Sequence, residues 1–254
     1  MAFTVSHAVL APLIARIFRF QLPVGALAIG CMAPDLYRLF THQHYFEPHQ
    51  WQHIFSVTLW IGLFFCLIWY GFYRQVLYRM IGLQDPLNID SFKDFIRFTL
   101  ANAIAVVIGI CTHLIWDGLT HVDFRTFAFH DFLATKITVF NYTFPMHRLM
   151  QIGSSALVLP VMLWMSWRYY KAYKQHFAVP KPIKQWRTII FTLSLTIGLF
   201  SAFDYLHHIP SKYFSSGLYS ITGRAINEFS QDFLISFSLG CILFLFLDRD
   251  KRLG

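Results

Sequence analysis

The strongest candidate for chemistry is a group of polar side chains inside an otherwise apolar stretch. His113, Asp117 and His121 recur at every fourth position, and on a helix this spacing stacks all three side chains along one face. Two imidazoles and a carboxylate can chelate a divalent metal, and a catalytic zinc site leaves one position open for water. The alternative is a polar face that hydrogen-bonds to neighbouring helices. We favour metal ligation, because ionisable groups at membrane depth are costly without a partner.

Further candidates lie before this stretch. His49 and His53 form a second pair four residues apart, for which interfacial side chains are the alternative. Asp35 follows an apolar run and is costly there unless it is paired, ligated or at the surface. His7 lies near the chain start. A hairpin of two short helices would return it to the same side as Asp35, whereas a single crossing would place it on the opposite side.

Two other groups lie further along the chain. His147 and Gln151 would share one helical face, and Arg148 between them could hold an anionic substrate group or a lipid phosphate. Asp204 and His208 are again four apart, and they could support the site from outside or form a separate one. The sequence contains no Gly-rich phosphate loop, GxSxG motif or Walker pattern.

The composition indicates that a membrane must position these residues. Of 254 residues, 56% are hydrophobic and 13% are charged, whereas soluble domains carry about 25% charged residues. Spanning helices need about 20 mostly apolar residues, and five stretches qualify: Phe55 to Trp69 (extending through Tyr73), Phe98 to Leu119, Leu149 to Trp167, Thr188 to Leu206 and Phe229 to Leu247. Prolines and arginines break the region from Ala8 to Met32 into two short helices. We therefore predict an all-α, polytopic membrane helix bundle of about five long spans plus an N-terminal short-helix hairpin, forming one domain over residues 1–254.

The distribution of basic residues predicts the orientation. If the spans alternate, thirteen Lys and Arg residues lie on one side, with the C-terminus, and six lie on the other. The positive-inside rule makes the first side cytoplasmic. We therefore expect a bacterial inner-membrane protein with a periplasmic histidine-rich face. Basic cytoplasmic loops account for the net charge of +8, so membrane lipid is the expected partner and nucleic acid is not. No feature identifies a protein partner, and the four cysteines show no clustered spacing.

Four segments of the chain match a known family pattern: Phe3 to Ala8, Ile29 to Asp35, Gly109 to His121, and Phe144 to Gln151. In order and spacing they resemble the bacterial membrane family registered as domain of unknown function 4184, from Met1 to about Trp167. The family has no settled activity. Where it usually has Thr-His-Ser near the first span, this chain has Gln52-His53-Ile54.

The chain is also loosely similar to membrane-bound metal-dependent hydrolases and to zinc-dependent phospholipase C. This resemblance implies six metal ligands: His7, Asp35, His53, His113, Asp117 and His121. The phospholipases continue with a His and a Glu four residues apart, whereas this chain has His147 and Gln151 there. Because an amide replaces the carboxylate, we expect one or two ions rather than a trinuclear site.

Together these features favour a metal-dependent hydrolase with zinc as the ion. Asp35 or Asp117 would orient the attacking water or act as base, and Arg148 would hold a phosphate. The depth of the site and the phospholipase likeness suggest a phospholipid or a lipid-linked phosphate as substrate. The alternatives are a non-enzymatic envelope-maintenance protein with a structural metal or partner-binding site, and a transporter. A transporter would need ionisable groups near the midplane and on both sides.

Overall fold

The computed structural model describes residues 4–41, 46–139, 142–176, 178–209 and 218–253. These residues are mostly helical, and the sheet among them is a two-stranded hairpin of β1 (Lys136–Val139) and β2 (Tyr142–Pro145). Five helices are long and apolar enough to cross a membrane. The predicted all-α, multi-pass bundle is therefore confirmed.

The spans coincide with the five predicted apolar stretches. The first, Trp51–Ile81, joins 3-10, π and α segments and includes α3 (Leu59–Ile68) and α4 (Arg74–Ile81). The others are the long helices α5 (Phe92–Gly118), α7 (Met146–Tyr173), α8 (Lys181–His208) and α9 (Leu218–Leu247). A helix satisfies its own backbone hydrogen bonds, which lipid cannot do. Large apolar side chains such as Leu163 and Phe246 remain exposed along these helices, as lipid-facing surfaces require.

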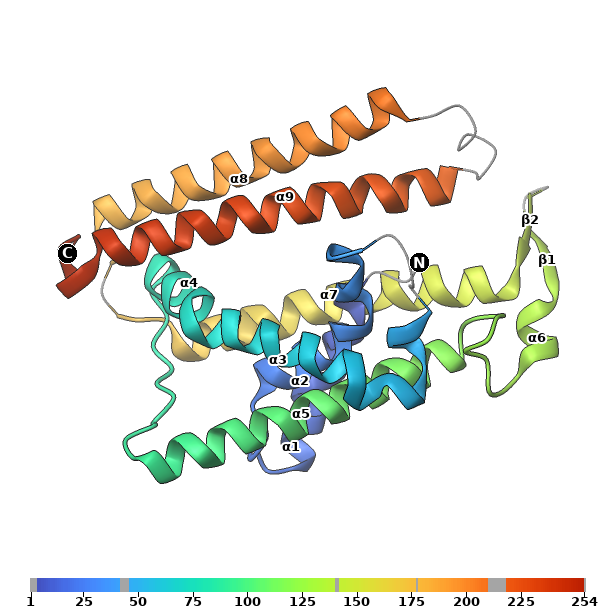
Figure 1. The fold of residues 1–254 in the computed structure, drawn as a ribbon, viewed down its shortest axis with the longest axis horizontal. Helices are drawn as coiled ribbons and strands as arrows, with labels where there is room; N and C mark the ends of the chain where they lie inside the picture. The colour runs from blue at the N-terminus through green and yellow to red at the C-terminus, as the bar shows by residue number, and fades with distance from the viewer. Residues whose placement is uncertain (1–3, 42–45, 140–141, 177, 210–217, 254) are drawn as a thin grey trace. The chain divides into compact units, whose positions relative to one another are not determined.

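Contacts divide the chain into two compact units, residues 1–67 with 86–172, and residues 68–85 with 173–254. In the second unit, α8 and α9 lie side by side and antiparallel (Figure 1). Its core consists of buried side chains from α4, α8 and α9: Val76, Met80, Ile183, Ile190, Phe237, Cys241 and Phe244. The expectation of one membrane domain stays a prediction.

The first unit begins with the predicted hairpin of short helices. The chain runs through η1 (Thr4–Leu10) and α1 (Ala11–Ile17) and turns where Arg19 and Phe20 adopt φ values of 51° and 58°. It then returns through α2 (Val24–Leu36). The Thr4 hydroxyl donates to Asp35 Oδ2 over 2.9 Å. The hairpin therefore brings the chain start beside the end of α2.

Two glycines set the distance between α2 and α5. A Cβ added at Gly30 would lie 2.4 Å from the Val106 carbonyl oxygen, and one added at Gly109 would lie 2.5 Å from the Leu27 carbonyl oxygen. No side chain fits at either position, so the two backbones touch where the helices cross. This close approach brings the α2 backbone within reach of side chains on α5.

Candidate metal centre

His113 on α5 is almost fully buried, with 1% of its surface exposed. Its Nδ1 lies 2.8 Å from the Cys31 carbonyl oxygen. Because a carbonyl only accepts, Nδ1 carries the proton and donates, and Nε2 keeps its lone pair. That Nε2 is buried without a hydrogen-bond partner, although buried polar atoms are normally satisfied. An imidazole that is anchored at one nitrogen, and whose other nitrogen faces a carboxylate oxygen at 3.5 Å without a hydrogen bond, has the arrangement of a metal ligand.

Asp117 lies one turn further along α5, and its carboxylate is surrounded by basic side chains. Its oxygens lie 2.9 Å from Arg125 Nη1, 3.5 Å from His113 Nε2, 3.5 Å from His121 Nδ1, 3.8 Å from His49 Nε2 and 3.9 Å from His7 Nε2. The contact with Arg125 is a hydrogen bond, whereas the distances to the imidazoles are longer than ordinary hydrogen bonds.

Asp35 provides a second buried carboxylate at the end of α2, directly after Pro34. Its Oδ2 accepts from Thr4, while its Oδ1 lies 3.4 Å from His49 Nε2 and 3.6 Å from Arg38 Nη2. His49 therefore lies between the two carboxylates, within 4 Å of an oxygen of each.

These side chains form two overlapping groups that could hold a metal ion. One consists of His7, Asp35 and His113, the other of His49, His113 and Asp117, and within each group one ligand atom per residue lies within 4.8 Å of the others. All five side chains are buried. The rings of His7 and His113 stack with centroids 4.0 Å apart. We call these five residues the His/Asp cluster.

Three members of the cluster, His7, His49 and Asp35, have shifted pKa values. Burial, with a smaller contribution from the neighbouring His113, lowers the pKa of His7 to about 3. Burial also lowers the pKa of His49. For Asp35, burial raises the pKa, but Arg38 and His49 outweigh it and hold the pKa well below its usual range. The imidazoles of His7 and His49 are therefore neutral and the Asp35 carboxylate is charged at neutral pH, which are the forms that bind metal.

The structure separates His49 and His53. The two were predicted to share a helical face, but Gln50 between them is extended (φ −112°, ψ 139°), and they lie in the separate short helices η3 (Glu47–His49) and η4 (Trp51–His53). His49 enters the cluster, whereas His53 Nδ1 lies 3.2 Å from the Ser56 hydroxyl. His49, and not His53, therefore lies in the His/Asp cluster.

His121 lies beside the cluster rather than in either three-residue group. Its Nδ1 is 3.2 Å from the Asp117 carbonyl oxygen and 3.2 Å from the Thr120 hydroxyl. Burial lowers the pKa of His121 to about 4. Gln151 is buried, and its amide donates to the Thr120 carbonyl over 2.9 Å. Gln151 therefore supports the backbone that carries His121.

The other predicted residues lie in different surroundings. Arg148 is exposed in the first turn of α7, and the neighbouring His147 has a buried Nδ1 without a hydrogen-bond partner. Asp204 Oδ1 and His208 Nδ1 lie 3.2 Å apart on exposed side chains in the second unit.

Sequence reasoning missed two arginines at the cluster, Arg38 and Arg125. Arg38 lies three residues after Asp35, and this i, i+3 spacing is the sequence feature that indicates an ion pair between them. Arg125 lies in the loop after α5, which folds back so that the Phe127 amide donates to the Gly118 carbonyl over 3.3 Å. Only that fold brings Arg125 to Asp117.

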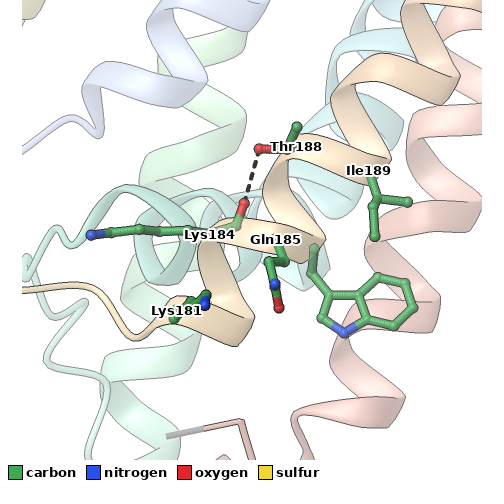
Figure 2. Close-up of a pocket in the computed structure, with 6 residues that line it drawn as sticks. Lys181, Lys184, Gln185, Thr188 and Ile189 are labelled. Carbon is green, nitrogen blue, oxygen red and sulfur yellow. Dashed lines mark hydrogen bonds between the residues drawn. The ribbon is translucent and has the colours of Figure 1, made fainter.

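A surface pocket on the first turns of α8 lacks such chemistry. Figure 2 shows its lining, which is Lys181, Lys184, Gln185, Trp186, Thr188 and Ile189. The Thr188 hydroxyl donates to the Lys184 carbonyl over 3.0 Å. The lining contains neither a histidine nor a carboxylate, so the His/Asp cluster remains the candidate site.

A family model described as Domain of unknown function (DUF4184) matches residues 1–247. No curated protein and no solved structure significantly matches the chain.

Proposed function

The chain belongs to this family of unknown function, and from its site we propose a zinc-dependent hydrolase that cleaves the phosphoester of a phospholipid or a lipid-linked phosphate. The observation that carries the proposal is the buried Nε2 of His113, which makes no hydrogen bond and lies 3.5 Å from Asp117 Oδ2. The Cys31 carbonyl holds its ring among four other ligand-bearing side chains. A hydrogen-bonded polar face would instead leave this nitrogen with a partner.

The donor set and its spacing support zinc. Ligand atoms 2.0–2.1 Å from a tetrahedral zinc lie about 3.3 Å from one another. In the cluster, His113 Nε2 lies 3.5 Å from Asp117 Oδ2, and His49 Nε2 lies 3.4 Å from Asp35 Oδ1. Both three-residue groups need the single free nitrogen of His113. They are therefore alternative descriptions of one ion site, and we propose one ion.

The residues of the cluster have distinct roles in the proposed reaction. The chemistry that zinc supplies when bound is a water nucleophile near neutral pH, because it lowers the pKa of that water to about 7. The ion would be held by His113, fixed by Cys31, together with either His7 and Asp35 or His49 and Asp117. Asp35 is fixed by the Thr4 hydroxyl, and either Asp35 or Asp117 acts as the base that accepts the proton.

We propose that the protein lies in the bacterial inner membrane with a cytoplasmic C-terminus and the cluster at the periplasmic side. The support is the excess of Lys and Arg in the loops on the side of the C-terminus. The cluster lies where α5 ends and where the first span begins. An amphiphilic substrate could therefore reach it from the bilayer surface.

The test combines metal analysis with lipid hydrolysis on detergent-purified protein. The parent should contain about one zinc per chain, and His113→Ala and Asp117→Ala should lose both zinc and hydrolysis. His130→Ala, an exposed histidine in the same unit, is the matched control. Folded parent without metal would remove the proposal. Stoichiometric zinc with no turnover of any phospholipid or lipid phosphate would favour the envelope-maintenance alternative, in which a structural metal lacks an open position.

A further inference from the structure

Two arginines, Arg38 and Arg125, pair with the carboxylates of the His/Asp cluster. The side chains of Arg38 and Arg125 are 19% and 10% exposed, whereas those of the carboxylates they pair with, Asp35 and Asp117, are 8% and 4% exposed. Each arginine side chain is therefore more exposed than the carboxylate it pairs with. Both arginines reach the same part of the cluster, because Asp35 Oδ1, 3.6 Å from Arg38 Nη2, and Asp117 Oδ2, 2.9 Å from Arg125 Nη1, each lie within 4 Å of His49 Nε2.

Arg125 is held in a fixed orientation by Asp123. Its Nε donates to Asp123 Oδ1 over 2.9 Å, its Nη2 donates to Asp123 Oδ2, and the Asp123 carboxylate also accepts from the Arg125 backbone amide. This two-pronged pairing leaves Nη1 directed at Asp117 Oδ2, 2.9 Å away. Asp123 is therefore a positioning residue that aims the guanidinium at the cluster.

The arginines contact the carboxylates that an ion would need. Arg125 contacts Asp117 Oδ2, the oxygen nearest His113, and Arg38 faces Asp35 Oδ1, the oxygen nearest His49. The carboxylates of Asp35, Asp117 and Asp123 and the guanidiniums of Arg38 and Arg125 together carry a net charge of −1. A bound divalent ion would change this net charge to +1. Once the ion takes over the carboxylate oxygens, the guanidiniums lose counter-charge and gain capacity for an anion.

We propose that Arg38 and Arg125 form an anion subsite that binds a phosphate group beside the metal ion, and this inference rests on the proposed function. Guanidiniums bind phosphate oxygens through paired N–H groups, a geometry that a lysine lacks. The phosphate group belongs either to a lipid headgroup or to a free phosphate.

The test measures binding of inorganic phosphate to zinc-loaded, full-length protein by calorimetry, with zinc content determined for every variant. The parent should bind phosphate, and Arg38→Gln and Arg38→Lys should each weaken binding by about tenfold or more while retaining zinc. Arg125→Lys keeps a charge beside Asp117 and Asp123 and should show the same loss. Arg97→Gln, an exposed residue at the opposite end of α5, is the matched control.

Several outcomes would overturn the inference. One is a zinc-loaded parent that binds no phosphate, and another is unchanged phosphate affinity in zinc-retaining Arg38 and Arg125 variants. A loss in Arg148→Gln alone would also overturn it, by moving the subsite to α7. Absence of zinc from the parent would instead remove the proposed function. Nanodiscs with phosphatidic acid, compared with phosphatidylcholine nanodiscs and with free phosphate, identify the source of the group, because a lipid subsite favours phosphatidic acid over both.

Discussion

Replacing Gly109 with alanine should weaken metal binding without touching a ligand. The added Cβ would lie 2.5 Å from the Leu27 carbonyl oxygen and 2.6 Å from the Cys31 amide nitrogen. An ordinary contact needs at least about 3.4 Å, so α2 must move from α5 by about 1 Å. The hydrogen bond from His113 to Cys31 is already 2.8 Å long, and the same movement would break it.

The expected magnitude has two parts. Overpacking a tight contact costs about 1–3 kcal/mol of stability, which a lower Tm should report. Loss of a partner that orients a ligand costs about 10–100-fold in metal affinity, which competition with a chromophoric zinc chelator measures in detergent.

The control is Gly153→Ala on α7, where an added Cβ meets nothing within 4 Å. Both substitutions raise helix propensity by the same replacement of glycine with alanine. The difference in Tm and zinc affinity between the two variants therefore reports the effect of the helix crossing alone. Equal zinc affinity and equal Tm in both variants would refute the idea that the glycine crossing positions His113.

Four further predictions follow from the same contacts. His49→Ala should lose most bound zinc whereas His53→Ala should keep it, because His49 faces Asp35 and Asp117 and His53 does not. Elemental analysis measures the zinc content of both variants, and the reverse result would restore the ligand set that the resemblance implied. Gly118→Ala should lower the Tm and the zinc affinity, since its Cβ would lie 2.1 Å from the Phe127 ring and displace the loop that carries Arg125. Removing zinc with a chelator should lower the Tm, and restoring zinc should recover it, because a ligand that binds only the folded state stabilises it; an unchanged Tm would count against a bound ion. Ser91→Ala should cost about 0.5–2 kcal/mol of stability with zinc content unchanged, since the Ser91 hydroxyl caps α5 by accepting from the Asp94 amide. Thermal unfolding measures the loss of stability, and a change in zinc content would contradict the idea that this cap acts independently of the site.

The local features of the protein were predictable from the sequence. Hydrophobic runs located the five spans, because lipid requires long apolar helices with internally satisfied backbones. Pro23 and the polar residues near it indicated the break between α1 and α2. The spacing of His113 and Asp117 placed both side chains on one face of α5, because helical periodicity is a local property.

The composition of the site was decided by contacts between residues far apart in the chain. Extended backbone at Gln50 directed His49 rather than His53 to the cluster, and a single extended residue leaves no periodic signal. Arg125 reached Asp117 through a loop that folds back on Gly118. The free nitrogen of His113 depends on a carbonyl 82 residues away, which comes within hydrogen-bond distance only where two glycines let the helices touch. Sequence periodicity thus determined which face of each helix is polar, whereas the close packing of α2 on α5 and the path of the loops decided which polar groups meet.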